Sequence, residues 1–371
     1  MISNRAALVA VIVALVSGLL ISLAIRPPTL ISDTTTGTSA TESVGFTPLR
    51  WRVPLFISEN LPVLGDSPVY LAESLSRVSA GAIQLDLFDP GEIVPAFSIT
   101  DAVREGKVQA GWTWLGYDQG KIPASALIGA APFGLEPWAY MGWWYKGGGR
   151  ELTEKIYTPH NLMPLLCGII GPETAGWFRQ PIESVADFQG LKIRFAGLGG
   201  KVLQRLGASV TMLPGGEIFQ ALEKGAIDAT EFSLPIVDEA LGFSRVAKNN
   251  YFPGWHQPYT TAHLVVNLQL WKALTEPEQA LFRTTCTAST GHLLAHGEAA
   301  QGAVIRGLGE AGVTARYLPR DILRELKSVT MQVLDEEAEN DPDFAAVLDS
   351  QRAFEADYAL WKRLAYLPSD L

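Results

Sequence analysis

The chain has 371 residues, enough for two lobes of ordinary size that each bury a core. Its 39 acidic side chains outnumber its 29 basic ones and its pI is near 5.1, which argues against a nucleic-acid partner because such a ligand requires a basic face. The two cysteines, Cys167 and Cys286, allow one disulfide that their spacing alone cannot establish. No Cys-x-x-Cys motif or clustered His/Cys pattern indicates a zinc site.

The N-terminal segment predicts an exported protein. Residues 6–25 carry no charge and, at ~1.5 Å per residue, are just long enough to span a ~30 Å hydrocarbon core. They also fit a long signal-peptide core with a weak cleavage site at 22–24. We therefore expect residues 1–25 to be a signal peptide or membrane anchor of a periplasmic protein, with a slight preference for cleavage. Residues 26–45 are rich in Thr and Ser, which predicts a flexible linker before a folded part that begins near Phe46.

Strands and helices alternate after this linker. Strands are expected at 49–57, 82–89 and 107–115, with helices at 67–81 and 99–106. This alternation predicts a parallel sheet with helical crossovers.

The same order recurs from residue 191. The expected strands are 191–196, 209–214 and 226–234, and the helices are 200–207 and 216–225, each ending at a glycine typical of a left-handed C-terminal cap. The segments AVREGKVQA at 102–110 and ALEKGAIDA at 221–229 share Ala, Gly and Ala at the same offsets. Either any helix–Gly–strand unit has this pattern, or two lobes share one βα plan. Two such lobes would form a cleft at the carboxyl ends of their strands.

The last third of the chain is predicted to be mostly helical. A helix is expected over 275–312, with a Thr cap, a following Pro and a Glu three residues after the Thr. A short strand at 313–318 and a helix at 319–339 follow. The long amphipathic helix predicted at 341–367 either braces both lobes or packs on a second subunit.

Arg194 stands out because it lies inside the strand 191–196. The glycines after it match neither G-x-G-x-x-G nor G-x-x-x-x-G-K-[ST], so they predict a tight strand-to-helix turn and not a phosphate loop. An arginine on a covered strand must lie near the strand end or be paired. Arg194 is therefore either paired with an internal acid or holds a ligand carboxylate through its planar fork.

Two glutamates occupy similar positions at the ends of strands. Glu231 ends the strand at 226–231, and Glu173 follows the apolar strand at 162–170. Each is either a solvated surface acid or, with Arg194, part of a site that holds an anion beside a hard cation. Catalytic motifs such as G-x-S-x-G and H-E-x-x-H are absent, and His256 has no nucleophile in its motif. The tryptophans at 112, 114, 143 and 144 either line a cleft or fill a core, and core filling is the expectation for most of them.

Three longer motifs carry a family resemblance. GPETAGWFR at 171–179, the segment 191–232 and YFPGWHQP at 251–258 together resemble the periplasmic solute-binding subunits of TRAP transporters. They are most similar to the branch that binds 2-oxo and 2-hydroxy monocarboxylates, and GEIVPAFSITDAV, APFGL and YKGGG fit that branch too. The resemblance covers about residues 47–370.

The resemblance implies an α/β, two-lobed periplasmic binding protein (Venus flytrap) with a long C-terminal helix, often a dimer in this branch. The implied function is capture of a small carboxylate with a metal ion and its delivery to TRAP permease subunits, without enzymatic chemistry. A membrane-anchored sensor is the alternative if residues 6–25 are retained. The implied divisions are 1–25 for export, 26–45 as linker, 46–170 plus about 262–301 as lobe I, and 171–261 plus about 302–371 as lobe II and the C-terminal helix.

The resemblance also assigns residues to a site. Arg194 is the expected carboxylate clamp, and the metal ligands are Glu231, the backbone carbonyl of Phe232 and the residue at a G-P-Q motif. That residue is Glu173 here, and Phe232 replaces a tryptophan usual in the branch. His256 and Trp112 complete the residues expected at the ligand.

The change to a carboxylate at Glu173 affects the expected cation. Glu173, Glu231 and the ligand carboxylate would place three negative charges against Arg194 and one cation. A divalent ion neutralises that set and a monovalent ion does not, so Ca²⁺ is expected over Na⁺. A protonated Glu173 is the rival interpretation.

Overall fold

The computed structural model describes residues 45–367, so the predicted export segment and nearly all of the predicted linker lie outside the described residues. Residues from Phe46 onward form one compact unit, as the sequence predicts for the start of the folded part. Among the described residues, no helix is both long and apolar enough to cross a membrane.

The first half of the fold, which contains the strands within 49–170 and the strand at 260–267, centres on two short sheets that meet edge to edge. Strand β1 (Leu49–Pro54) pairs in parallel with β2 (Ile83–Phe88), and β3 (Ala110–Thr113) and β4 (Leu162–Ile170) flank β10 (Thr260–Asn267). A parallel bridge between Leu55 and Trp112 joins β1 to β3. β10 runs antiparallel to both of its neighbours. The predicted parallel pairing holds for β1, β2 and the bridge to β3, but β10, a strand from much later in the chain, enters antiparallel between β3 and β4.

A six-stranded mixed sheet forms the second half of the fold, in the order β11-β9-β5-β8-β6-β7. Its strands are β5 (Gly176–Phe178), β6 (Lys192–Arg194), β7 (Ser209–Thr211), β8 (Ala229–Thr230), β9 (Asn249–Phe252) and β11 (Thr314–Tyr317). β6 pairs in parallel with β7 and β8, as the βα repeat predicts. β5 is antiparallel to β8 and β9. The strand predicted over 226–234 is only two residues long, because the chain leaves the sheet directly before Glu231.

Helices cover these sheets from residue 66 to residue 365; the seven helices that the sequence predicts are all present, and six further helices were not predicted. They are α2 (Asp66–Val78), α3 (Ile99–Arg104), α4 (Ser125–Gly129), α5 (Pro137–Lys146), α6 (Gly149–Tyr157), α7 (Gly197–Arg205), α8 (Gly215–Glu223), α9 (Pro235–Ala240), α10 (Phe243–Val246), α11 (Leu268–Ala273), α12 (Glu276–Leu308), α13 (Arg320–Asn340) and α14 (Pro342–Ala365). The glycines that follow α3 and α8, Gly106 and Gly225, both have φ of +72°, in the left-handed region that stops a helix.

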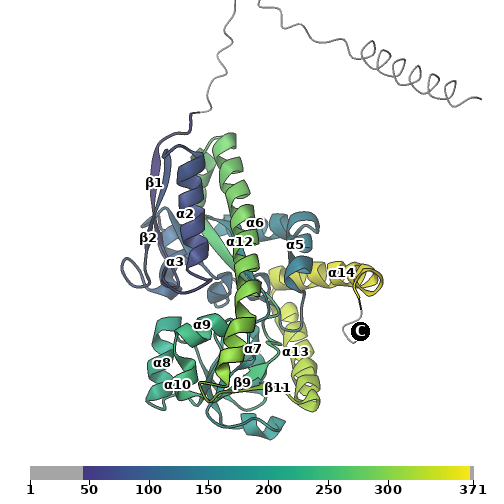
Figure 1. The fold of residues 1–371 in the computed structure, drawn as a ribbon. Coiled ribbons are helices and arrows are strands. Elements are labelled where there is room, and N and C mark those ends of the chain that lie inside the picture. The colour runs from purple at the N-terminus through teal and green to yellow at the C-terminus, as the bar shows by residue number, and fades with distance from the viewer. Residues whose placement is uncertain (1–44, 368–371) are drawn as a thin grey trace, which may run out of the picture. The chain divides into compact units, whose positions relative to one another are not determined.

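The 33-residue helix α12 contacts elements of both halves (Figure 1). The predicted capping box is present: Thr275 accepts a hydrogen bond from the Glu278 backbone N–H, and the Glu278 carboxylate accepts one from that of Thr275. Along its length α12 packs on α2, β4 and α9. A disulfide between Cys167 on β4 and Cys286 on α12 ties the helix to the first half. The structure therefore contains the Cys167–Cys286 disulfide, which the spacing of the cysteines could not establish.

Candidate functional site

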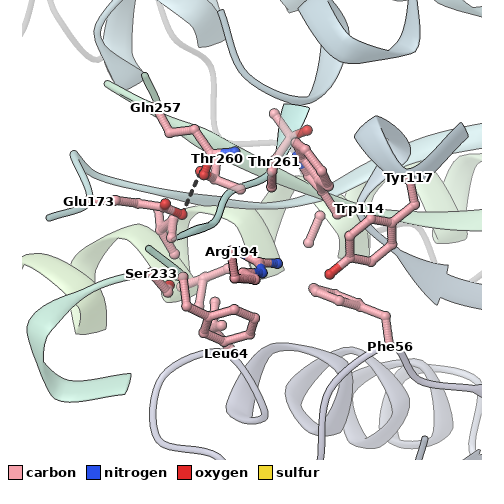
Figure 2. A pocket seen from close by; sticks show the side chains of 15 residues that line it. Phe56, Leu64, Trp114, Tyr117, Glu173, Arg194, Ser233, Gln257, Thr260 and Thr261 are labelled. Carbon is pink, nitrogen blue, oxygen red and sulfur yellow. Dashed lines mark hydrogen bonds between the residues drawn. The ribbon is translucent and has the colours of Figure 1, made fainter. Parts of the chain in front are cut away.

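A small cavity lies where strand ends of both halves meet (Figure 2). Its walls carry Trp114 after β3, Arg194 at the end of β6, and Thr260 and Thr261 at the start of β10. The cavity volume is about 40 Å³, and by the same measure one water molecule needs roughly 10–15 Å³. The space therefore suits a ligand of a few heavy atoms.

Arg194 is almost fully buried, with 1% of its surface exposed. Its Nε donates to the backbone carbonyl of Leu213 at 3.1 Å, and its Nη1 donates to the backbone carbonyl and to Oε1 of Glu231 at 2.8 and 2.7 Å. Nη2 makes no hydrogen bond to a residue that the structure describes. In Figure 2 the guanidinium faces the cavity, toward the Tyr117 hydroxyl. Arg194 therefore fits both of the predicted roles: it is paired with an internal acid, Glu231, and its Nη2 still has donors for a ligand.

Glu231 is fully buried beside this arginine. Its Oε1 accepts hydrogen bonds from Arg194 and from the backbone N–H of Ala196. Burial raises the pKa of Glu231, but the charge of Arg194, helped by His256, outweighs burial and leaves that pKa below its usual value. Its Oε2 has no hydrogen-bond partner within residues 45–367. Glu231 is thus an ionised carboxylate with one oxygen still available.

Glu173 is buried on the opposite side of the same cluster, so it is not a solvated surface acid. Its Oε1 accepts a hydrogen bond from Thr260 Oγ1 at 2.8 Å. With the Gln257 amide nitrogen turned toward it, Gln257 donates to both carboxylate oxygens, at 2.9 and 2.5 Å. Burial, reinforced by the nearby Glu231 charge, raises the pKa of Glu173 to about 7.

His256 lies between the two glutamates. Its Nε2 is 3.6 Å from Glu173 Oε2 and 3.6 Å from Glu231 Oε2, too far for good hydrogen bonds. Burial lowers the pKa of His256, but the two carboxylates outweigh burial and raise it to about 9. Neither ring nitrogen has a hydrogen-bond partner among the described residues. The imidazole is therefore buried with unused polar atoms on both sides.

The donor set of this cluster fits a metal ion. Glu173, Glu231 and His256 each offer a ligand atom, and these atoms lie within 4.8 Å of one another. Leaving a buried polar atom unpaired costs about 1–3 kcal/mol, and the cluster contains three such atoms, Glu231 Oε2 and both His256 nitrogens. An ion bound here would supply the missing partner. The carboxylate oxygens suit a hard cation. His256 adds a nitrogen donor; the sequence predicted it as a contact of the bound carboxylate, not as a metal ligand.

Comparison with known proteins identifies the family. Residues 56–341 match the bacterial extracellular solute-binding proteins of family 7. The chain belongs to this family. It is accordingly a solute-binding subunit of the TRAP transporter type and not an enzyme, and the predicted α/β, two-lobed binding-protein fold is confirmed.

Individual relatives cover nearly the whole chain. A monocarboxylate 2-oxoacid-binding periplasmic protein of Nostoc sp. is 34% identical over 92% of this chain and 94% of its own length. A TRAP solute-binding protein of Bordetella bronchiseptica, a mixed-occupancy dimer with calcium and picolinate bound, is 32% identical with a TM-score of 0.84 over 86% of this chain and 95% of that one. One of Pseudoalteromonas atlantica, with sodium and pyruvate bound, is 28% identical with a TM-score of 0.83 over 86% and 97%. The family and these relatives support transport over a membrane-anchored sensor.

The glycine-rich turn after β6 packs against the indole ring of Trp114. Gly197 has φ of +60°, and a Cβ there would lie 3.2 Å from Cη2 of Trp114. A Cβ at Gly116 would clash with the same indole ring, and a Cβ at Gly129 would lie 2.6 Å from its Nε1. Three glycines thus make room for one indole ring, which packs an element of the first half against the start of α7. This finding agrees with the prediction of a structural turn.

The structure brings together all but one of the residues predicted for the site. Phe232 lines the cavity with its ring 5.3 Å from the Arg194 guanidinium carbon, in cation–π contact. Trp112 does not line the cavity; it is buried in the core around β1, β3 and β10. The correction has a simple cause: Trp112 lies within strand β3, whereas Trp114 lies just past the strand end, where the cavity opens.

Several cavity residues were not predicted. Phe56, Tyr117 and Thr260 line the cavity, and burial raises the pKa of the Tyr117 phenol to about 12. Gln257 also lines the cavity and lies inside the YFPGWHQP motif, next to His256, and Thr260 lies two residues beyond this motif. The motif was therefore a usable signal for both residues. Phe56 and Tyr117 belong to segments with no distinguishing pattern, and only the packing of the two halves places them here.

Proposed function

We propose that this chain captures a small 2-oxo or 2-hydroxy monocarboxylate together with a metal ion and delivers it to the membrane permease of a TRAP transporter. The observation that carries the proposal is Arg194, whose Nε and Nη1 are held by the protein while Nη2 keeps its donors beside the cavity. A ligand carboxylate at Nη2 would receive a charge-assisted hydrogen bond from a preorganised guanidinium. The small cavity and the ligands named for the Nostoc and Pseudoalteromonas relatives support this ligand class.

For the metal we propose Ca²⁺ in preference to Na⁺. A cation held by Glu173 and Glu231 keeps both carboxylates ionised and His256 neutral, because a cation and an imidazolium this close would repel each other. Those two charges and the ligand carboxylate then face Arg194, which leaves two negative charges for the cation to neutralise. Relatives hold either calcium or sodium. The backbone carbonyl of Phe232 is proposed as a further ligand.

Ligand capture requires no covalent step. We propose that the lobes, 46–170 plus about 262–301 and 171–261 plus about 302–371, close by hinge motion around the bound carboxylate. The packing of Trp114 on Gly197 would then form as the cleft shuts. We also place the protein in the periplasm and propose a homodimer, which the dimeric Bordetella relative and the exposed apolar side chains of α14, such as Trp361 and Leu364, support.

Calorimetric titration tests the ligand class and the cation together. Pyruvate, lactate and a sugar acid are titrated into chelator-treated protein with Ca²⁺, with Na⁺ alone and with neither. The proposal expects tight binding of a 2-oxo or 2-hydroxy acid that strengthens at least tenfold with Ca²⁺. Absence of binding by any monocarboxylate refutes the ligand class, and equal affinity in Na⁺ alone at pH 8 refutes the calcium preference.

A further inference from the structure

A pair of histidines lies on the solvent-facing side of α12, outside the ligand cavity. His292 and His296 are four residues apart on this helix, and both are exposed. Residues four apart on a helix share one face. Because α12 is one continuous helix that packs on α2 (Figure 1), this face is a fixed part of the fold.

Each of the two imidazoles is supported by a side chain from α2. Asp66 Oδ2 lies 2.8 Å from Nδ1 of His296, and Tyr70 stacks on His292 with ring centroids 4.3 Å apart and planes 10° from parallel. Asp66 and Tyr70 are themselves four residues apart. The Asp66 carboxylate is held in turn by the backbone N–H of Val63, 3.2 Å away. Both imidazole rings are therefore oriented before any ligand arrives.

This arrangement has the elements of a transition-metal site. A carboxylate on Nδ1 fixes the tautomer of a histidine and leaves Nε2 as the metal ligand. Two histidines at i and i+4 of a helix are a known chelating pair, and the centroids of these two rings are 6.4 Å apart. Imidazole nitrogens select Zn²⁺, Cu²⁺ or Ni²⁺ over Ca²⁺ and Na⁺, which prefer oxygen.

We propose that His292 and His296 form a second metal site, for a borderline divalent cation such as Zn²⁺, Cu²⁺ or Ni²⁺. Asp66 and Tyr70 orient the two ligands, and water completes the coordination. The site differs in chemistry from the cluster of Glu173, Glu231 and His256. The spacing of His292 and His296 is visible in the sequence, but the residues that orient them, Asp66 and Tyr70, lie more than 200 positions earlier in the chain.

The test is titration of the chelator-treated protein with CuCl2 and ZnCl2, followed by calorimetry and thermal unfolding. The double variant His292→Ala/His296→Ala should bind one ion fewer than the wild-type protein. Each single variant should lower the affinity for that ion at least tenfold, and Asp66→Asn should lower it about tenfold. Any ion bound by the cavity cluster is retained in all of these variants, so it is counted separately. Copper EPR should report two nitrogen ligands in the wild-type protein and one in each single variant.

Two further variants serve as matched controls. His160→Ala removes a histidine elsewhere and should change nothing. Gly291→His/His292→Ala keeps the number of histidines but spaces them five apart, onto different faces, and an added Cβ at Gly291 meets no neighbour. This variant should lose the ion while its melting temperature without metal stays near that of the wild-type protein. Retained affinity in this variant, or an unchanged ion count in the double alanine variant, overturns the proposal.

Discussion

Replacing Glu173 by glutamine removes a buried carboxylate at nearly constant shape. Burial raises the pKa of Glu173 from 4.5 to about 7, and a shift of one unit corresponds to about 1.4 kcal/mol. The carboxylate therefore costs up to roughly 3 kcal/mol of folding free energy once it is ionised. Because the folded-state pKa is the higher one, the associated stability is present below pH 4.5 and is lost as the pH rises through about 7.

Glu173→Gln should consequently be more stable than the wild-type protein at pH 8, by up to roughly 3 kcal/mol, and about equally stable at pH 4.5. Urea unfolding with a chelator, followed at both pH values, measures this difference. The same substitution should reduce the preference for Ca²⁺ over Na⁺ in ligand titrations at least tenfold, because one of two carboxylates is gone. A variant that gains no stability at pH 8 and keeps the calcium preference would refute the reasoning.

Asp118→Asn provides the matched control for this experiment. Asp118 is also a buried acid whose pKa burial raises, to about 6, and it accepts hydrogen bonds from Thr100 and Tyr157. It does not line the ligand cavity. Its replacement should alter the stability profile between about pH 4 and 6 and leave the calcium response as in the wild-type protein.

The remaining predictions concern the clamp, the glycine turn and the disulfide. Arg194→Lys should lower the affinity for pyruvate at least 100-fold, about 2.7 kcal/mol, because lysine lacks the planar fork; calorimetry measures this loss, and an unchanged affinity contradicts the role of the clamp. Gly197→Ala should weaken ligand binding about tenfold, and adding Trp114→Phe should restore most of it because the outer indole ring is removed; additive losses in this double-mutant cycle would show that the two residues are not coupled. Replacing Cys167 and Cys286 by serine should lower the free energy of unfolding by about 2–4 kcal/mol, and urea unfolding without any such loss contradicts this estimate.

Local patterns in the sequence determined much of this protein. Helix ends follow from residues next to them, as at Gly225 and at the capping box of Thr275, because capping depends on contacts within a few positions. Arg194 was recognisable because a charged side chain in an apolar strand requires a partner. The family resemblance followed from long ordered motifs, which can be recognised without knowing how the strands pair.

Tertiary structure decided what depends on residues distant in the chain. The antiparallel entry of β10, the Cys167–Cys286 disulfide and the placement of His256 between Glu173 and Glu231 all join segments far apart in sequence. Strand alternation cannot tell Trp112 from Trp114, since the difference is where β3 stops and the cavity opens. The histidine pair of α12 likewise acquires its orientation only from α2. In each case the side chain is visible in the sequence, but its chemistry is set by neighbours that packing supplies.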